Sequence, residues 1–180
     1  MKAPAQIETS RLFLRTPTRA DAEAIFERYA SAPAVTRFLA WPTHRSAHDT
    51  LAFLEFCESE WLRWPAGPYL MFSLADGRLL GSTGLNFKSP TDVFTGYVLA
   101  QDSWGQGYAT EALTAMIELA RQIGVRRLSA LCHPEHRASR HVLEKCRFEL
   151  ANPATQSHEF PNLAPGVRQN TFCYELPLVE

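Results

Sequence analysis

The spacing of hydrophobic and polar positions divides the first half of the chain into a strand and two helices. Residues 11–15 alternate, with both leucines on one face, which is typical of a short strand. Apolar residues at helical spacing predict a helix over 18–29 and another over 46–61. Each begins with Thr or Ser followed three residues later by Asp, a typical helix start. Pro33 and Pro42 are expected to break the chain between them.

The second half of the chain continues this alternation of strands and helices. In order, the pattern predicts strands at 69–74, 79–87 and 93–100, a helix at 111–123, a strand at 128–132, a helix at 136–145, and strands at 148–150 and 169–176. Asp76-Gly77 is a hairpin signal, and Gly124 suits the position just after a helix. A long loop is expected at 152–166. The order predicts a mixed α/β fold in one domain, residues 1–180.

Composition narrows the class of protein. The 180 residues carry a formal net charge of −1, which gives no basis for non-specific nucleic-acid binding. There is no apolar run of about 18 residues that could span a membrane, and residues 1–6 lack the apolar core of a signal peptide. A cytoplasmic protein is therefore expected. The four cysteines are scattered without the spacing of a zinc or redox pair, so reduced thiols and no metal are expected.

The strongest chemical signal is the run WGQGYATEA at 104–112, between a predicted strand and a predicted helix. Glycines permit positive φ and close backbone approach to a ligand, and the free N–H groups of a helix's first turn attract anions. The segment is a candidate pyrophosphate cradle. A tight turn before a helix is the alternative. The absence of a third glycine argues against a dinucleotide fold, and no Lys-Ser/Thr closes the motif as in a P-loop.

Several motifs together resemble one family. The glycine run, the segment 136–148 (HRASRHVLEKCRF), the start 8–15 (ETSRLFLR) and the segment 81–85 (GSTGL) are similar to those of the GCN5-related N-acetyltransferases, the GNAT superfamily. The branch resembled is that of the ribosomal-protein-alanine acetyltransferases, over about residues 7–176. The resemblance implies a mostly antiparallel sheet of about seven strands flanked by about four helices.

The resemblance also implies the acyl donor, acetyl-CoA, and how it is held. Pantetheine would lie between splayed strands near Tyr97 and Leu131 and bond to the backbone of 97–99. The cofactor-binding residues expected are Tyr97, Val98, Leu99, Trp104, Gly105, Gln106, Gly107, Tyr108, Ala109, Thr110, His136, Ser139 and Arg140. Glu111, in the same turn, is interpreted as a capping or dipole-compensating carboxylate.

The catalytic groups are less explicit in the sequence. Many relatives carry a tyrosine as general acid where this chain has Leu143, and in the ribosomal-protein branch a serine matching Ser139 is the proposed thiol donor. The alternative for Ser139 is a helix serine bonded to a backbone carbonyl. No general base can be identified: Phe94 occupies the position where relatives often have Glu. His44, in the region that lines the acceptor cleft of this fold, is the acceptor-side candidate, and His133 and His136 are the other histidines considered.

Three positions depart from the family pattern. Asp102 stands where Arg or Gln is usual, and its charge is expected to repel phosphate. His136 replaces an Asn and keeps hydrogen-bonding capacity. Arg147 replaces a glycine before the final phenylalanine, so the helix end there is expected to be altered.

The leading hypothesis is an acetyl-CoA-dependent N-acetyltransferase that acts on a protein N-terminal α-amine or a small amine, as a monomer or homodimer. The alternative is a non-catalytic acyl-CoA sensor or scaffold, which Asp102, Leu143 and the missing Glu favour slightly. A nucleotide-binding oxidoreductase is disfavoured by the absent third glycine. Asp49, Asp92 and Glu159 are candidates to receive a cationic amine.

Overall fold

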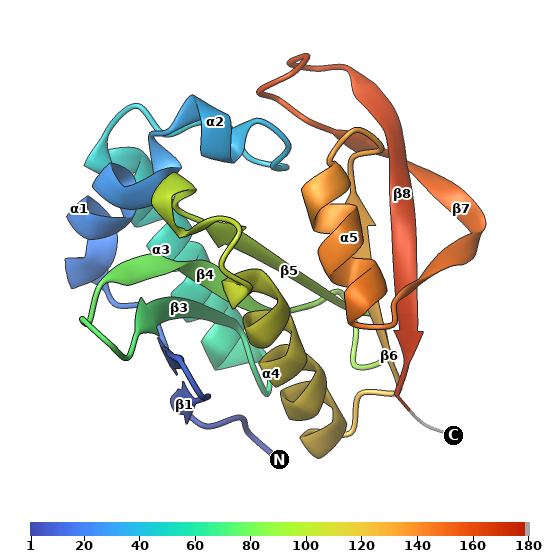
Figure 1. The fold of residues 1–180 in the computed structure, drawn as a ribbon, viewed down its shortest axis with the longest axis horizontal. Helices are drawn as coiled ribbons and strands as arrows, with labels where there is room; N and C mark the ends of the chain where they lie inside the picture. Colours follow the sequence, from blue (N-terminus) through green and yellow to red (C-terminus); the bar gives the residue numbers. More distant parts are fainter. Residues whose placement is uncertain (179–180) are drawn as a thin grey trace.

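One twisted, open sheet organises the molecule (Figure 1). The computed structural model describes residues 1–178, with 152–155 described by their backbone alone. The strands are β1 (Gln6–Glu8), β2 (Leu12–Arg15), β3 (Pro68–Ser73), β4 (Leu79–Phe87), β5 (Val93–Leu99), β6 (Arg127–Cys132), β7 (Glu149–Glu159) and β8 (Arg168–Pro177). Their order in the sheet is β1-β2-β3-β4-β5-β6-β8-β7.

The pairing between β5 and β6 differs from the rest of the sheet. Among the described pairs it alone is parallel, and it consists of Val93 with Leu128 and Phe94 with Ser129. Beyond Phe94, β5 continues beside β4 alone and β6 continues beside β8 alone. The two strands therefore splay apart, as the resemblance implies, and each presents an unpaired backbone edge to the gap.

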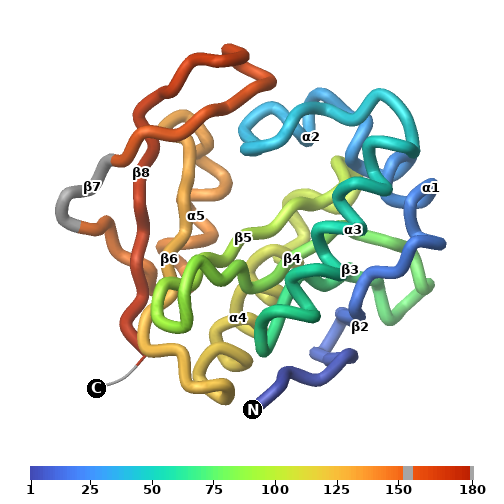
Figure 2. Tube along the Cα trace, turned by 180° about the vertical axis from the view of Figure 1, so that it is seen from behind, coloured from blue at the N-terminus to red at the C-terminus, as the bar shows by residue number. Residues whose placement is uncertain are grey.

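Helices cover both faces of the sheet. They are η1 (Arg19–Asp21), α1 (Ala22–Ile25), η2 (Phe26–Ala30), α2 (Pro33–Thr36), α3 (Ala47–Arg63), η3 (Gln101–Ser103), α4 (Tyr108–Gln122) and α5 (Arg137–Lys145). α4 and α5 lie in front of the sheet in Figure 1, and α3 lies nearer the viewer in the reverse view of Figure 2. The predicted N-terminal boxes form: Thr18 with Asp21, and Ser46 with Asp49.

Two hydrophobic clusters, one on each face, hold the layers together. Leu12 and Leu14 are fully buried in the cluster that includes α4, as their alternation predicts. On β3, Met71 belongs to this cluster, whereas its neighbour Leu70 belongs to the cluster under α1 and α3. Successive strand residues point to opposite faces, so β3 is apolar on both sides. Its position in the middle of a two-sided core follows from this pattern.

Three predictions about individual elements are wrong. β1 was not expected, because Gln6–Glu8 is too short and polar to give a strand pattern, and its pairing with β2 defines it. Pro33 does not break the chain: it begins α2, where a proline lacks no needed N–H. The loop expected at 152–166 begins later, since β7 extends to Glu159 along the ladder that β8 offers.

The predicted fold class, a mixed and mostly antiparallel α/β sheet with helices on both faces, is confirmed, with one strand more than the seven expected. Within the described residues no helix is long and apolar enough to cross a membrane.

Candidate active site

The glycine run forms the turn between η3 and α4. Gly105 and Gly107 have φ values of 73° and 81°, which side chains disfavour. A Cβ on Gly105 would meet no atom within 4 Å, so this face of the turn is open. Among the described residues, none accepts a hydrogen bond from the backbone N–H groups of residues 105–110. These donors face outward at the N-terminus of a 15-residue helix, which is the arrangement that binds anions.

The carbonyl groups of the same turn are occupied, in contrast to its N–H groups. Gln106 donates from Nε2 to the carbonyl of Asp102 at 2.9 Å, and Arg11 donates to the carbonyl of Gln106 at 2.8 Å. The indole of Trp104 donates to the carbonyl of Leu99 at 2.9 Å. Side chains thus fix the turn through its acceptors and leave its donors available for a phosphate group.

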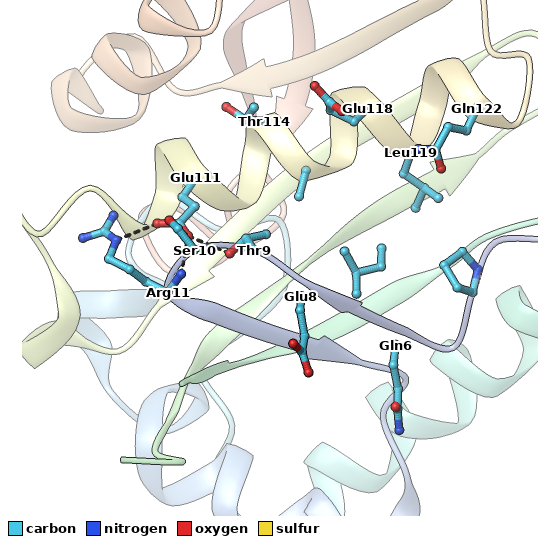
Figure 3. Close-up of a pocket in the computed structure, with 13 residues that line it drawn as sticks. Gln6, Glu8, Thr9, Ser10, Arg11, Glu111, Thr114, Glu118, Leu119 and Gln122 are labelled. Carbon is cyan, nitrogen blue, oxygen red and sulfur yellow. Dashed lines mark hydrogen bonds and ion pairs between the residues drawn. The ribbon is translucent and has the colours of Figure 1, made fainter. Parts of the chain in front are cut away.

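Glu111 anchors the start of α4 to the hairpin of β1 and β2 (Figure 3). Its carboxylate accepts from the hydroxyls of Thr9 and Ser10 at 2.6 and 2.9 Å, and from the backbone N and Nε of Arg11 at 2.8 and 2.7 Å. Burial alone would raise the pKa of Glu111, but these hydrogen bonds lower it below its ordinary value. The residue is a structural anchor beside a pocket of about 610 Å³, in agreement with its interpretation as a capping carboxylate.

Asp102 does not present an isolated negative charge to the turn. Its carboxylate lies 2.9 Å from Arg28 Nη2 and 2.9 Å from Arg78 Nη1. Hydrogen bonding by Arg28 is the main cause that lowers the pKa of Asp102. With Asp76, whose carboxylate lies 3.6 Å from Arg78 Nε, the cluster has two guanidinium groups and two carboxylates, so the charge of Asp102 is balanced. The expected repulsion of phosphate stays a prediction.

A cavity of about 1400 Å³ occupies the splay between β5 and β6. It begins at the unpaired edge of β5, near Tyr97 and Val98, and passes His136 and Ser139 at the start of α5. Gly96 has nothing within 4 Å of an added Cβ, so the face of the sheet beside this edge is open. The gap has room for an extended chain bonded to this edge as an added strand.

Ser139 lies across this gap from Tyr97. The phenol oxygen of Tyr97 is 3.0 Å from the Ser139 carbonyl oxygen and 3.1 Å from Ser139 Oγ, so its one proton can be donated to either. No hydrogen bond within the described residues joins Ser139 Oγ to a carbonyl of the preceding turn, which the alternative interpretation required. The hydroxyl therefore faces the cavity and the phenol. The sequence did not indicate the role of Tyr97, because only its backbone was expected to contribute.

The far end of the cavity is lined by aromatic and histidine rings from distant segments. Phe38 stacks against His133 and His136 with ring centroids 5.0 and 4.8 Å apart, and Phe160 meets His133 edge-on at 4.8 Å. Burial, and then the neighbouring His133, lower the pKa of His136. Its imidazole is therefore neutral at neutral pH.

His44 lines the same end of the cavity. Its Nδ1 is 2.9 Å from the hydroxyl of Thr50, and its ring is tilted against Trp41 at 4.9 Å. Burial lowers the pKa of His44, an effect that Asp49 partly opposes. In the tautomer with hydrogen on Nδ1, Thr50 accepts that hydrogen and Nε2 is left as a base. Of the three acidic candidates only Asp49 lines the cavity, and it accepts from the backbone N–H groups of Arg45 and Ser46.

Asn162, which sequence reasoning missed, lines the far end of the cavity and joins two segments of the chain there. Its Oδ1 accepts from the N–H and hydroxyl of Thr43 at 2.8 and 3.1 Å, and its Nδ2 donates to the carbonyls of Thr36 and Trp41 at 2.7 and 2.8 Å. The loop between β7 and β8 is thereby fixed to the segment after α2, and both figures show the two close together (Figures 1 and 2). A single Asn in a loop carries no sequence signal of such a role.

Comparison with known proteins agrees with this geometry. The family model described as an acetyltransferase (GNAT) domain matches residues 11–149. The chain belongs to the GNAT acetyltransferase family. A curated relative, an uncharacterized N-acetyltransferase of Bacillus subtilis named YoaA, is 25% identical over 152 residues, with 79% of this chain and 82% of the relative covered.

Solved structures of GNAT proteins share the fold. A GNAT-family acetyltransferase from Bacillus anthracis superimposes with a TM-score of 0.80 at 21% identity, with 97% of this chain and 99% of that chain covered. RimL, a ribosomal L7/L12 α-N-protein acetyltransferase in complex with CoA, gives a TM-score of 0.80 at 21% identity, with 98% and 97% covered. The resemblance to the GNAT superfamily is confirmed.

Within this GNAT fold, two of the predicted residues need further description. Arg140 does not line the cavity: it donates to Tyr174 Oη at 3.3 Å and packs over the ring of Phe172. Arg147 adopts φ of 66°, and the N–H of Phe148 still bonds the Leu143 carbonyl at 3.0 Å. The expected alteration of this helix end is absent, because Arg147 itself adopts the left-handed conformation. The part of the chain that the structure describes contains no group of three or more His, Cys, Asp or Glu residues that could hold a metal ion.

Proposed function

We propose that this chain transfers the acetyl group of acetyl-CoA to a primary amine by direct attack within a ternary complex, with residues 1–180 acting as one domain. The observation that carries the proposal is the succession of three features along β5. A turn with free N–H donors at 105–110 is joined to the end of β5 by the hydrogen bond from Trp104 to the Leu99 carbonyl, the edge of β5 beyond Phe94 is unpaired, and a cavity lined by Ser139 lies along that edge. This layout suits a ligand with a phosphate-bearing end, an extended arm and a reactive tip.

The site residues divide between the two substrates. The turn and the β5 edge would hold the pyrophosphate and pantetheine, and Ser139 would lie at the thioester sulfur. His44, whose pKa is lowered by burial, would accept the proton that the amine loses. That assignment requires an imidazole that is neutral near pH 7, which the direction of its pKa shift provides.

The acceptor class is narrowed by the scarcity of negative charge. Among the described lining residues Asp49 is the one carboxylate, and it caps α3, whereas Phe38, Trp41, Phe53 and Phe160 present apolar surface. A polyamine needs several carboxylates, and it finds none here beyond Asp49. We infer an acceptor with a single amine on an apolar or aromatic body, either a small molecule or the end of a peptide.

An acceptor screen tests this function. The purified chain is incubated with acetyl-CoA and three sets of amines: aromatic monoamines, short peptides with a free N-terminus, and polyamines. Release of CoA and the mass of the acetylated product are measured. Transfer to a monoamine or peptide in preference to polyamines is expected. Tight acetyl-CoA binding without transfer to any set would instead favour the non-catalytic sensor.

A further inference from the structure

Tyr97 is placed to act on Ser139. The tyrosine lies on β5 beyond the last β5–β6 pair, and Ser139 lies in the first turn of α5 on the opposite side of the gap. Their hydroxyl oxygens are 3.1 Å apart, within hydrogen-bonding distance, and both residues line the cavity. The phenol thus joins β5 to α5 across the splay.

Counting protons shows what this pair offers to a ligand. Each hydroxyl has one proton and can also accept hydrogen bonds. The phenol has one proton. It donates that proton either to the Ser139 carbonyl at 3.0 Å, which leaves Ser139 Oγ able to donate to the phenol oxygen, or to Ser139 Oγ at 3.1 Å. In the second arrangement the serine proton is not directed at Tyr97 and is available to a ligand in the cavity. A hydroxyl that receives a hydrogen bond is also polarised and becomes a stronger donor.

We propose that Tyr97 is a positioning residue for the acetyl transfer: its phenol donates to Ser139 Oγ and so aims the serine proton at the sulfur of the departing CoA. The inference rests on the proposed function and adds the hydroxyl of Tyr97 to the groups that take part in it. As the amine nitrogen bonds to the carbonyl carbon, the C–S bond breaks and its electron pair stays on sulfur. Ser139 stabilises that negative charge with its O–H. The proton that the amine loses balances the proton that sulfur finally takes, and both hydroxyls keep their own.

The surroundings keep the phenol in its donor form. Burial raises the pKa of Tyr97, and the hydrogen bond with Ser139 lowers it by less. The titratable groups that face the pair are Cys132 at the end of β6, and His136 and Cys146, which flank α5 at its two ends. Burial raises the pKa of both thiols, and burial lowers that of His136, so all three neighbours are uncharged near pH 7. No charge from these three groups competes with the hydroxyl pair.

The test measures the thiol of bound CoA and requires no acceptor. CoA is bound to the whole chain, and the ultraviolet absorbance of its thiolate is followed against pH after subtraction of the protein spectrum. A donor at the sulfur stabilises the thiolate, so the thiol pKa of bound CoA should lie below that of free CoA. Tyr97→Phe, which keeps the ring, should raise it by about one unit. Ser139→Ala should raise it as much, and the double variant no further.

A matched control separates this role from support of the helix. Tyr174 also contacts α5, through Arg140 and Glu144, but it does not line the cavity. Tyr174→Phe should leave the thiol pKa unchanged. A shift with Ser139→Ala but none with Tyr97→Phe would overturn the inference while leaving the proposed function intact. Failure of the native chain to bind CoA would overturn the proposed function, and this inference with it.

Discussion

The two parts of the proposed site are built from different groups. The proposed donor end, outside and along the edge of the cavity, consists of backbone: the N–H groups of 105–110 and the free edge of β5, with side chains such as Arg11 only fixing the turn. The proposed acceptor end, inside the cavity, consists of side chains from three segments: the stretch after α2, the start of α5 and the loop between β7 and β8. A site made of backbone groups depends on the conformation of the chain, whereas a site made of side chains depends on which residues are present.

This difference explains why one fold can keep its donor and change its acceptor. Substituting a side chain at the donor end leaves its N–H groups in place, provided that the glycines remain. Under the proposed function, substitution of Phe38 or His44 would directly change the surface that contacts the acceptor. The donor end is therefore expected to be sensitive at few positions and the acceptor end at many.

The largest expected effect concerns His44. His44→Gln removes the proposed base and should lower kcat about 100-fold with the acceptor found in the screen. Because burial lowers the pKa of His44 below its usual 6.5, the native activity should be retained at neutral pH and fall only at lower pH, as the imidazole becomes protonated. The variant should lack this fall. His48→Gln, an exposed histidine on α3, is the control. Equal rates for both variants would remove His44 from the chemistry.

The next effect tests the backbone character of the donor end. Gly107→Val forces a β-branched residue into φ of 81° and brings its Cβ to 3.4 Å from Arg11 Nη2. We expect the affinity for acetyl-CoA to fall at least tenfold. The free energy that corresponds to this loss is about what a residue with a side chain costs in the left-handed conformation. Gly77→Val carries similar strain, with φ of 70°, in the β3–β4 turn and should leave affinity unchanged. Titration calorimetry compares the two, and equal losses would indicate a general effect of strain.

Asn162→Ala tests the part of the site that is proposed to bind the acceptor. The loss of its four hydrogen bonds should free the loop between β7 and β8 from the segment after α2, beside the proposed acceptor end. Steady-state kinetics should show an acceptor KM raised about fivefold, roughly the value of one net hydrogen bond, and an unchanged KM for acetyl-CoA. Asn170→Ala, an exposed position on β8, serves as control. A rise confined to the KM for acetyl-CoA would contradict the division of the cavity.

The smallest effect is one of stability. Arg147 holds φ of 66°, where glycine is favoured. Arg147→Gly should raise the free energy of unfolding by about 1 kcal/mol, measured by urea denaturation. Arg147→Ala removes the arginine side chain but keeps a Cβ at this positive φ, so the free energy of unfolding should not rise. A similar gain from both variants would assign the effect to the arginine side chain.

The sequence predicted the donor end better than the acceptor end for the same physical reason. Gly105, Gly107 and the helix start are adjacent in the chain, so a local motif contains the whole cradle. The pairing of Asp102 could not be predicted, because its partners, Arg28 and Arg78, are 74 and 24 residues away. Asn162 bonds to Thr36 across 126 residues, a contact that no local pattern encodes.

The elements of the fold likewise divide into those that local signals predict and those that depend on a distant partner. Capping boxes and leucine alternation predicted α3 and β2, since these signals are local. β1 and the extension of β7 depend on a partner strand, and their own residues give a weak pattern. The site residues on β5 and α5 stay predictions until substitutions test them.

The central claim is that the turn at 105–110 and the edge of β5 form a site for acetyl-CoA. Calorimetric titration of acetyl-CoA into the purified chain tests it directly, with CoA and NAD as comparators. We expect one-to-one binding of acetyl-CoA and CoA, with a dissociation constant on the order of micromolar, and no binding of NAD. No binding of acetyl-CoA, or equal binding of NAD, would contradict the account.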